Sequence, residues 1–221
     1  MLADETRLRA RTDPNGILFT FWLFTGLRPA ELLGVRWTDV ELAGEGKTAY
    51  GVLTVRQRIV WLKGAKLDVD EPKSEAGKRP IYFPFWLHYD LMGHKAGQDE
   101  HKRRAGDYTD MGLVFAKPTG LPMRRDAVSA GVLKPLLKRA GLPETYSPYT
   151  LRRSFCLLLR RAGVSAKEVS EQMGHTSPAF TERTYRTVYD SAKREMSDKL
   201  ESVLSGGVGT QAAHNESNVV M

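Results

Sequence analysis

The chain has 221 residues, 41% of them hydrophobic, and its 33 Lys and Arg residues exceed its 26 Asp and Glu residues to give a net charge of +7. This composition suits a globular protein with one good core or two small ones, and the positive charge favours a polyanionic partner, most simply nucleic acid. The sequence has no apolar run of the ~18 residues that a membrane span needs, no signal peptide, and a single cysteine, Cys156, which we interpret as a packing residue of a cytoplasmic protein.

The first predicted elements lead up to a charged side chain, Arg28. Met1 to Asp13 is charged and predicts an exposed N-terminal segment, whereas the apolar run Ile17 to Phe24 predicts a buried central helix that ends at Gly26. Arg28 directly precedes a proline at a typical first helical position, and Glu31 is close enough to fold back onto its guanidinium group. Taken by itself, this pair could equally cap a short helix or serve a function.

A β-rich region follows. Tyr50 to Val60 alternates and contains many β-branched residues, and further strands are predicted within Ala65 to Glu71 and over Lys78 to Phe83. Between the last two strands, the composition of Pro72 to Gly77 is typical of a turn. We therefore expect a hairpin with Lys73 near its tip.

The middle of the chain is predicted to be helical, with one long loop. Trp86 to His94 and Arg124 to Ala140 read as helices, and the charged stretch Ala96 to Asp110 reads as a surface loop. We expect no metal site in this region, because thiolates are absent nearby and the histidines do not have the spacing of metal ligands: His88, His94 and His101.

Ser147 to Tyr185 predicts three short helices with sharply defined starts. Ser147 and Pro148 are typical of an N-cap and a first helical residue, Ser165 and Glu168 form a capping-box pattern, and Ser177-Pro178 opens the third helix. Gly174 is suited to end the second helix. Because helix N-termini attract anions, the polar residues at these junctions predict a phosphate site: Tyr149, Arg152, Arg153 and His175.

The C-terminal region divides at residue 204. Asp190 to Leu204 predicts a final amphipathic helix, and 205–221 has the composition of a mobile tail. We expect a single mainly α-helical domain over 1–204 with a small antiparallel three-stranded sheet at one edge, an α+β fold.

Several reaction classes lack their motifs. The sequence has no P-loop, no Gly-rich dinucleotide fingerprint, no serine nucleophile elbow and no acidic cluster for a two-metal nuclease. The remaining set is coherent for metal-free phosphoryl transfer, in which arginines grip the phosphate oxygens, a lysine protonates the leaving group and Tyr185 attacks.

Four stretches in order, spanning Thr25 to Tyr185, resemble the tyrosine recombinase or phage integrase family: TGLRPAELLGVRW, EPKSEAGKRPIYFP, YTLRRSFCLLLRRAG and SEQMGHTSPAFTERTY. The resemblance implies that Tyr185 is the nucleophile, that Lys73 is the general acid, and that Glu31 supports a catalytic arginine. The remaining catalytic positions it implies are Arg28, Arg152 and His175. It also implies site-specific recombination or integration of double-stranded DNA through a 3′-phosphotyrosine, without metal, ATP or another cofactor, by protomers that assemble on the DNA.

The chain departs from the family pattern in three places. Tyr149 and Arg153 stand where relatives usually carry histidines; Tyr149 can still donate a hydrogen bond to phosphate, and Arg153 is predicted to contact DNA or to form a local ion pair. Only 27 residues precede Arg28, too few for the separate helical domain that relatives carry there. We expect this core-binding domain to be absent from the chain.

Two alternatives remain open. The chain could be a DNA-binding module derived from an integrase that no longer cuts, because of Tyr149 and the missing front domain. A tyrosine-type topoisomerase has the same chemistry, although the short chain and the motif around His175 favour a recombinase.

Overall fold

The computed structural model of the protein describes residues 15–62, 67–72, 77–175, 177–179, 181–183 and 196. The chain divides into two units, Met1–Thr181 and Glu182–Met221. All named elements belong to the first unit, and the predicted segments 1–13, 190–204 and 205–221 lie outside the described residues, Met196 excepted. The helices are α2 (Gly16–Thr25), α3 (Pro29–Leu32), α4 (Phe85–Arg104), α5 (Arg125–Ala127), α6 (Lys134–Arg139), α7 (Pro148–Arg161) and α8 (Ala166–Met173), with short helical turns at Trp37–Asp39 and Gly46–Thr48.

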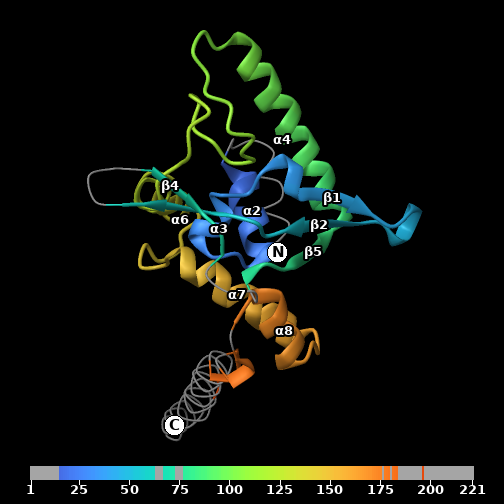
Figure 1. The fold of residues 1–221 in the computed structure, drawn as a ribbon. Coiled ribbons are helices and arrows are strands. Elements are labelled where there is room, and N and C mark those ends of the chain that lie inside the picture. Colours follow the sequence, from blue (N-terminus) through green and yellow to red (C-terminus); the bar gives the residue numbers. More distant parts are fainter. Residues whose placement is uncertain are drawn as a thin grey trace, which may run out of the picture. The chain divides into compact units, whose positions relative to one another are not determined.

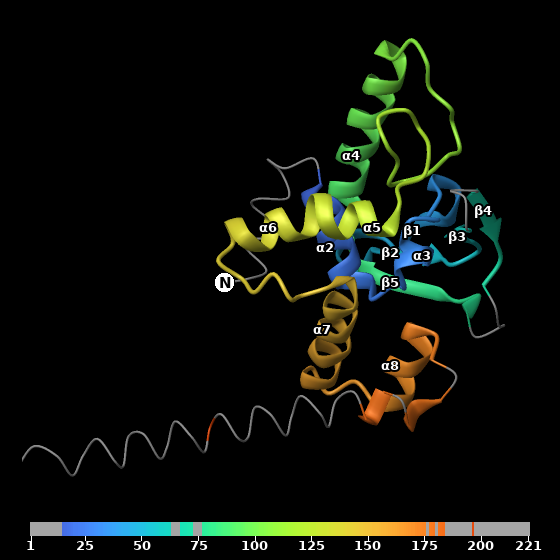
Figure 2. The ribbon, with the colours of Figure 1, turned by 90° about the vertical axis from the view of Figure 1, so that its left-hand side faces the viewer.

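Five strands form two small antiparallel sheets. They are β1 (Val40–Ala43), β2 (Tyr50–Thr54), β3 (Arg58–Trp61), β4 (Leu67–Asp70) and β5 (Pro80–Pro84). The order in the larger sheet is β1-β2-β5, with Val52 opposite Tyr82, and β3 pairs with β4 in the other. Figures 1 and 2 show α2 in the middle of the first unit, with α4 on one side of the larger sheet and α7 and α8 on the opposite side. The predicted fold, mainly helical with a small three-stranded antiparallel sheet, is confirmed.

The predicted strand pairing is wrong. The stretch 50–60 is two strands, because the chain leaves the larger sheet after Val55, whose amide donates to the carbonyl of Arg79 at 3.0 Å. The side chain of Gln57 then donates to the carbonyl of Gly34 at 2.9 Å, which directs the chain into β3. Since β4 pairs with β3 and β5 with β2, the predicted hairpin around Lys73 does not form; the chain passes there from one sheet to the other, and Lys73 itself lies outside the described residues.

Helix α2 is the centre of the main hydrophobic core, as predicted. Phe21 and Trp22 are fully buried, and the ring of Phe21 packs against those of Phe83 and Phe115, with centroids 5.3 and 5.7 Å apart. Gly26 ends the helix in the left-handed conformation, at φ 60°. The helix thus joins the sheet to the chain that follows it, where Arg28 lies.

Helix α4 extends to Arg104, so the prediction of a loop from Ala96 is wrong for 96–104. Leu87 and Leu91 are buried. Further along the helix, polar side chains form hydrogen bonds to the carbonyls of residues 113 and 114. The imidazole of His94 bonds to the carbonyl of Val114 at 2.8 Å, and the amide of Gln98 donates to the carbonyl of Leu113 at 3.1 Å. Apolar periodicity could not detect a helix face whose contacts are hydrogen bonds.

The predicted helix over Arg124 to Ala140 is present as α5, a π-helical stretch at Val128–Leu133, and α6. The π-helical stretch directly precedes Lys134-Pro135. Because proline lacks an amide hydrogen and crowds the preceding turn, a wider turn at this place relieves that crowding.

Helices α7 and α8 form a smaller hydrophobic cluster of their own, made by Phe155, Cys156, Val169 and Met173. Cys156 is buried, which confirms its packing role. The first two predicted helix starts are confirmed: the amide of Ser147 donates to the hydroxyl of Thr150 at 3.0 Å, and Ser165 and Glu168 exchange hydrogen bonds of 2.9 and 3.2 Å. At the third, the described residues from Pro178 onward are helical, and the amide of Ala179 donates to the hydroxyl of Ser177 at 3.2 Å. Among the described residues, no helix is both long and apolar enough to cross a membrane.

Candidate functional site

The turn between α2 and α3 fixes Arg28 and Glu31. Trp22 Nε1 donates to the carbonyl of Leu27 at 2.8 Å, which holds the turn against the core. Glu31 Oε1 accepts from Arg28 Nη1 at 2.7 Å, and Glu31 Oε2 accepts from the Arg28 amide at 3.0 Å, so the predicted fold-back is confirmed. The Glu31 side chain is only 4% exposed, whereas that of Arg28 is 39% exposed. The carboxylate thus lies inside the protein and the guanidinium group at its surface.

Arg79, directly before β5, is a second partner of Glu31 that sequence reasoning missed. Its Nη2 lies 3.1 Å from Glu31 Oε2, and its side chain is 6% exposed. A hydrogen bond from Nη1 to the carbonyl of Gly77 measures 3.0 Å. The arginine stands in the same stretch, EPKSEAGKRPIYFP, that carries the family resemblance. Its place at the start of an alternating strand was the available signal.

Arg152 projects from α7 into the junction between the two hydrophobic clusters. It is 6% exposed, and its Nη1 and Nη2 donate to the carbonyls of Gly26 and Met173, at 2.5 and 2.6 Å. Because these acceptors belong to the end of α2 and the end of α8, one guanidinium group connects three helices.

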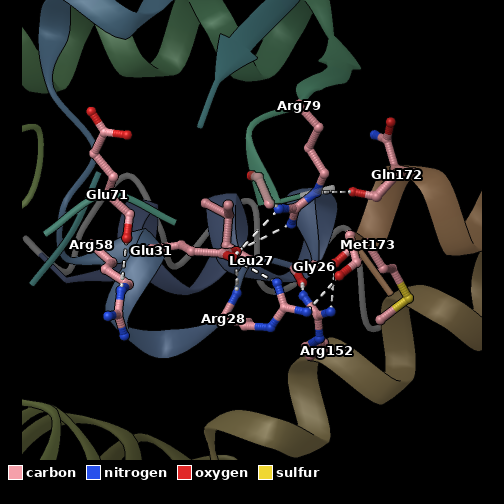
Figure 3. Close-up of polar contacts among 12 residues, drawn as sticks. Gly26, Leu27, Arg28, Glu31, Arg58, Glu71, Arg79, Arg152, Gln172 and Met173 are labelled. Atoms are coloured by element: carbon pink, nitrogen blue, oxygen red, sulfur yellow. Dashed lines mark hydrogen bonds and ion pairs between the residues drawn. The ribbon is translucent and has the colours of Figure 1, made fainter. Parts of the chain in front are cut away.

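The C-terminal end of α8 accepts hydrogen bonds from all three arginines. The carbonyls of the successive residues 172–174 accept from Arg79, Arg152 and Arg28, at 2.8, 2.6 and 2.5 Å respectively. Figure 3 shows these guanidinium groups gathered beside the end of α8, with Arg79 entering from the side opposite to Arg28 and Arg152. Terminal helix carbonyls lack partners within the helix and carry partial negative charge, so they are natural acceptors for arginine.

His175 follows immediately after this helix end. The amides of Gly174, at φ 63°, and His175 bond back to the carbonyls of Glu171 and Ser170, at 3.0 and 2.9 Å, an arrangement that requires the left-handed glycine. His175 Nδ1 lies 2.8 Å from the hydroxyl oxygen of the fully buried Thr181. The predicted C-terminal role of Gly174 is confirmed, and the imidazole ring is held in one orientation.

The site has an excess of buried positive charge. Burial, together with the charges of Arg28 and Arg79, lowers the pKa of Arg152 to about 9. Burial followed by the charge of Arg152 and the other arginines lowers the pKa of His175 to about 4, so the imidazole is neutral near pH 7. Burial opposes ionisation of Glu31, but its ion pairs with Arg79 and Arg28 outweigh burial and lower its pKa. An anion at this place would relieve the mutual repulsion of the arginines.

Two comparisons with known proteins bear on the family. Residues 86–192, a stretch that contains Arg152, His175 and Tyr185, match the Phage integrase family. Over 199 residues the chain is 30% identical to a protein named tyrosine recombinase XerC-like from Caldanaerobacter subterraneus subsp. tengcongensis, covering 84% of this chain and 49% of that protein. The chain carries a phage integrase family domain.

Further comparisons agree with this result. A protein named integrase from Streptomyces ambofaciens is 29% identical over 166 residues, covering 74% of this chain and 42% of that protein. The chain spans about half the length of the curated relatives it matches. Among solved structures, the Tn1549 transposon integrase in complex with circular intermediate DNA is 26% identical, with a TM-score of 0.60 and coverage of 83% of this chain and 59% of that chain. XerA recombinase, 20% identical over 89% of this chain and 60% of that one, shares the fold with a TM-score of 0.60.

The structure brings together four of the predicted site residues: Arg28, Glu31, Arg152 and His175. Tyr149 and Arg153 lie in the first turns of α7 and are both exposed. Lys73 and Tyr185 lie outside the described residues, so their predicted roles stay predictions. Within the described ranges, no three His, Cys, Asp or Glu side chains are grouped closely enough to hold a metal ion.

Proposed function

We propose that residues 1–204 form the catalytic domain of a site-specific DNA recombinase that cuts one strand through Tyr185 and rejoins it to another, and that 205–221 is a tail. One observation carries the proposal: Arg28 and Arg152 meet beside a neutral His175 at the end of α8. The phage integrase family domain supplies the reaction class.

The arginine cluster is suited to a phosphodiester in its transition state. Attack at phosphorus increases the negative charge on the non-bridging oxygens, and planar guanidinium groups can each bind such oxygens through two N–H donors. The carbonyls at 172–174 and the carboxylate of Glu31 fix these groups before any ligand arrives. Preorganised charge of this kind lowers the barrier, because little reorganisation is needed during the reaction.

The covalent step conserves the energy of the broken bond. The Tyr185 oxygen forms a bond to phosphorus while the bond from phosphorus to the 5′ oxygen breaks, and Lys73 gives the departing oxygen its proton. The reverse attack by a 5′ hydroxyl of another strand releases Tyr185 and completes the exchange. This sequence of steps uses neither ATP nor a metal ion.

His175 and Tyr149 are proposed to form hydrogen bonds with the phosphate oxygens during the reaction. Since His175 is neutral and its Nδ1 faces Thr181, its Nε2 can donate a hydrogen bond to a phosphate oxygen or accept the proton of the nucleophile, according to which of the two nitrogens carries the ring proton. Tyr149, three residues before Arg152 on α7, donates from its phenol where relatives usually have histidine.

The proposed partner is double-stranded DNA, with further protomers assembled on it. The net charge of +7 supports a polyanionic partner, and the similar Tn1549 integrase is known in complex with circular intermediate DNA. The exposed Arg153 is proposed to contact the DNA backbone. Binding through phosphate contacts should weaken steeply with salt.

Covalent trapping tests the proposal. Duplexes with a random central sequence and a nick, from which the cleaved 5′ fragment diffuses away, would be incubated with the protein in EDTA and separated on a denaturing gel. We expect a protein–DNA adduct with the wild type, and at least 100-fold less with Arg152→Lys, because lysine cannot donate to two acceptors in the guanidinium geometry. The matched variant Arg153→Lys, one residue along the same helix and exposed, should retain the adduct. Tight DNA binding with no adduct from any sequence would instead support a DNA-binding module that does not cut.

A further inference from the structure

We infer that Arg79 is a positioning residue of this site, which neutralises Glu31 and thereby leaves the charge of Arg28 for the phosphate. The inference rests on the proposed function only in taking phosphate as the ligand. It concerns a residue that the family resemblance did not single out.

Arg79 is directed at the protein and away from solvent. Its Nε donates to the carbonyl of Gln172, its Nη1 to that of Gly77, and both Nη atoms face the carboxylate of Glu31, at 3.4 and 3.1 Å. Its side chain is 6% exposed, and four of its five N–H donors bond to protein acceptors, so Arg79 is held by the protein and is not presented to a substrate. It can act only through the groups that it holds.

The charges around Glu31 explain how Arg79 affects Arg28. One buried carboxylate faces two guanidinium groups, the buried Arg79 and the surface-facing Arg28. With Arg79 present, the three groups carry a net charge of +1, and it lies on the side of Arg28. Without Arg79, Glu31 and Arg28 would form a neutral pair, and the field that Arg28 presents to an anion would be largely cancelled.

Arg79 also bonds to two residues, Gly77 and Gln172, that lie close in sequence to predicted catalytic residues. Gly77, one of its acceptors, follows the segment 73–76 that contains Lys73, and Gln172 begins the carbonyl run that ends directly before His175. The same guanidinium group therefore fixes Gly77 and Gln172 relative to Glu31, as Figure 3 shows for Gln172 and Glu31.

The chain offers a control carboxylate outside the arginine cluster at the end of α8. Asp39 is 3% exposed and also faces two arginines, with Arg36 Nε at 2.8 Å and Arg56 Nε at 3.3 Å. Replacement of one of these arginines removes the same kind of partner from the same kind of buried carboxylate. It leaves the arginines at the end of α8 unchanged.

The experiment measures binding of inorganic phosphate, so it needs neither DNA nor catalysis. Isotope-labelled protein would be titrated with phosphate while the NMR signals of the arginine Nε–H groups and of the His175 ring are followed, and thermal unfolding would show that each variant folds. We expect Arg79→Gln to weaken phosphate binding at least fivefold, and the pair Glu31→Gln with Arg79→Gln to bind within twofold of the wild type. Arg79→Lys, which keeps the charge, and Arg36→Gln, the control, should also stay within twofold.

Rescue by Glu31→Gln distinguishes neutralisation from a merely structural role, since a structural defect would deepen when the second partner is changed. The inference is overturned if Arg79→Gln binds like the wild type, if the double variant is as weak as the single one, or if the wild type shows no phosphate binding at these signals. Should Arg79→Gln not fold, the double variant and Arg79→Lys decide, because the inference requires both to bind like the wild type. The predicted order of affinities in a chain that forms no DNA adduct would sustain this inference and count against the recombinase proposal.

Discussion

Arg152 Nη1 donates a hydrogen bond of 2.5 Å to the carbonyl of Gly26, across 126 positions of sequence. This carbonyl is presented by a glycine in the left-handed conformation, against which the ring of Phe155 packs. The end of the central helix therefore serves both as a helix terminus and as a support for the second arginine of the site. A change at Gly26 should affect stability and activity together.

Gly26→Ala tests this relationship. An added Cβ would lie 2.3 Å from Phe155 Cδ1, at a φ of 60° that alanine rarely adopts. We expect a loss of about 2–4 kcal/mol of unfolding free energy, from backbone strain and steric overlap together, measured by denaturant titration. Gly97→Ala in α4 is the control, because nothing lies within 4 Å of its added Cβ, and it should stabilise by about 0.5–1 kcal/mol. Equal effects of the two changes on the free energy of unfolding would show that neither the left-handed conformation of Gly26 nor its contact with Phe155 matters for stability.

Lys73→Ala tests the predicted general acid. We expect cleavage of ordinary DNA to fall by about 100-fold or more, because the 5′ oxygen then leaves without its proton. An oligonucleotide whose 3′-phosphate is esterified with 4-nitrophenol should react at nearly the wild-type rate, because nitrophenolate needs no proton. An equal loss on both substrates would assign Lys73 to binding instead of proton transfer.

Tyr149→His tests whether the departure from the family pattern costs activity. Tyr149 is exposed in the first turn of α7, one helical turn before Arg152, so the exchange should not disturb the core. We expect faster single-turnover cleavage, since an imidazole suits acid–base work near neutral pH better than a phenol. Unchanged or slower cleavage would show that tyrosine costs nothing there.

His175→Gln tests the electrostatics through the pH dependence of stability. Between pH 6.5 and about 4, the unfolded chain binds a proton at His175 that the folded protein does not, so stability is complete above pH 6.5 and falls as the pH falls. The slope from this residue should be below about 1.4 kcal/mol per pH unit, because the half-buried ring is partly screened. His88 and His94, whose pKa values burial also lowers, remain in both proteins. Thermal unfolding at several pH values should therefore show a smaller slope for the variant, and identical slopes would contradict the assigned charge state.

Features set by neighbouring residues were predictable from the sequence. The fold-back of Glu31 onto Arg28, the capping of α8 by Ser165 and Glu168, and the helix end at Gly174 are confirmed, because each depends on residues at most three or four positions apart. The burial of α2 also followed from its composition, since a helix that is apolar on all sides has no place at the surface.

Features set by distant residues were not predictable in this way. The partners of Arg79 lie 48 and 93 positions away, at Glu31 and Gln172, so only the packed fold identifies the residue as part of the site. The predicted strand pairing is wrong for the same reason: alternation of apolar and polar residues indicates a strand but does not determine which strand it pairs with. The prediction ended helix α4 too early. Charged pairs such as Lys95 with Asp99 and the hydrogen bonds of Gln98 stabilise the rest of the helix without an apolar pattern.

The central claim is that Tyr185 forms a covalent bond with DNA under the charge of the arginine cluster. The most direct measurement is mass spectrometry of peptides from the trapped adduct, after nuclease digestion of the DNA. The account predicts a single nucleotide joined through its 3′-phosphate to Tyr185, and no such peptide from Tyr185→Phe. A nucleotide on Tyr189 or another residue, a 5′-phosphate linkage, or an undiminished adduct from Tyr185→Phe would contradict it.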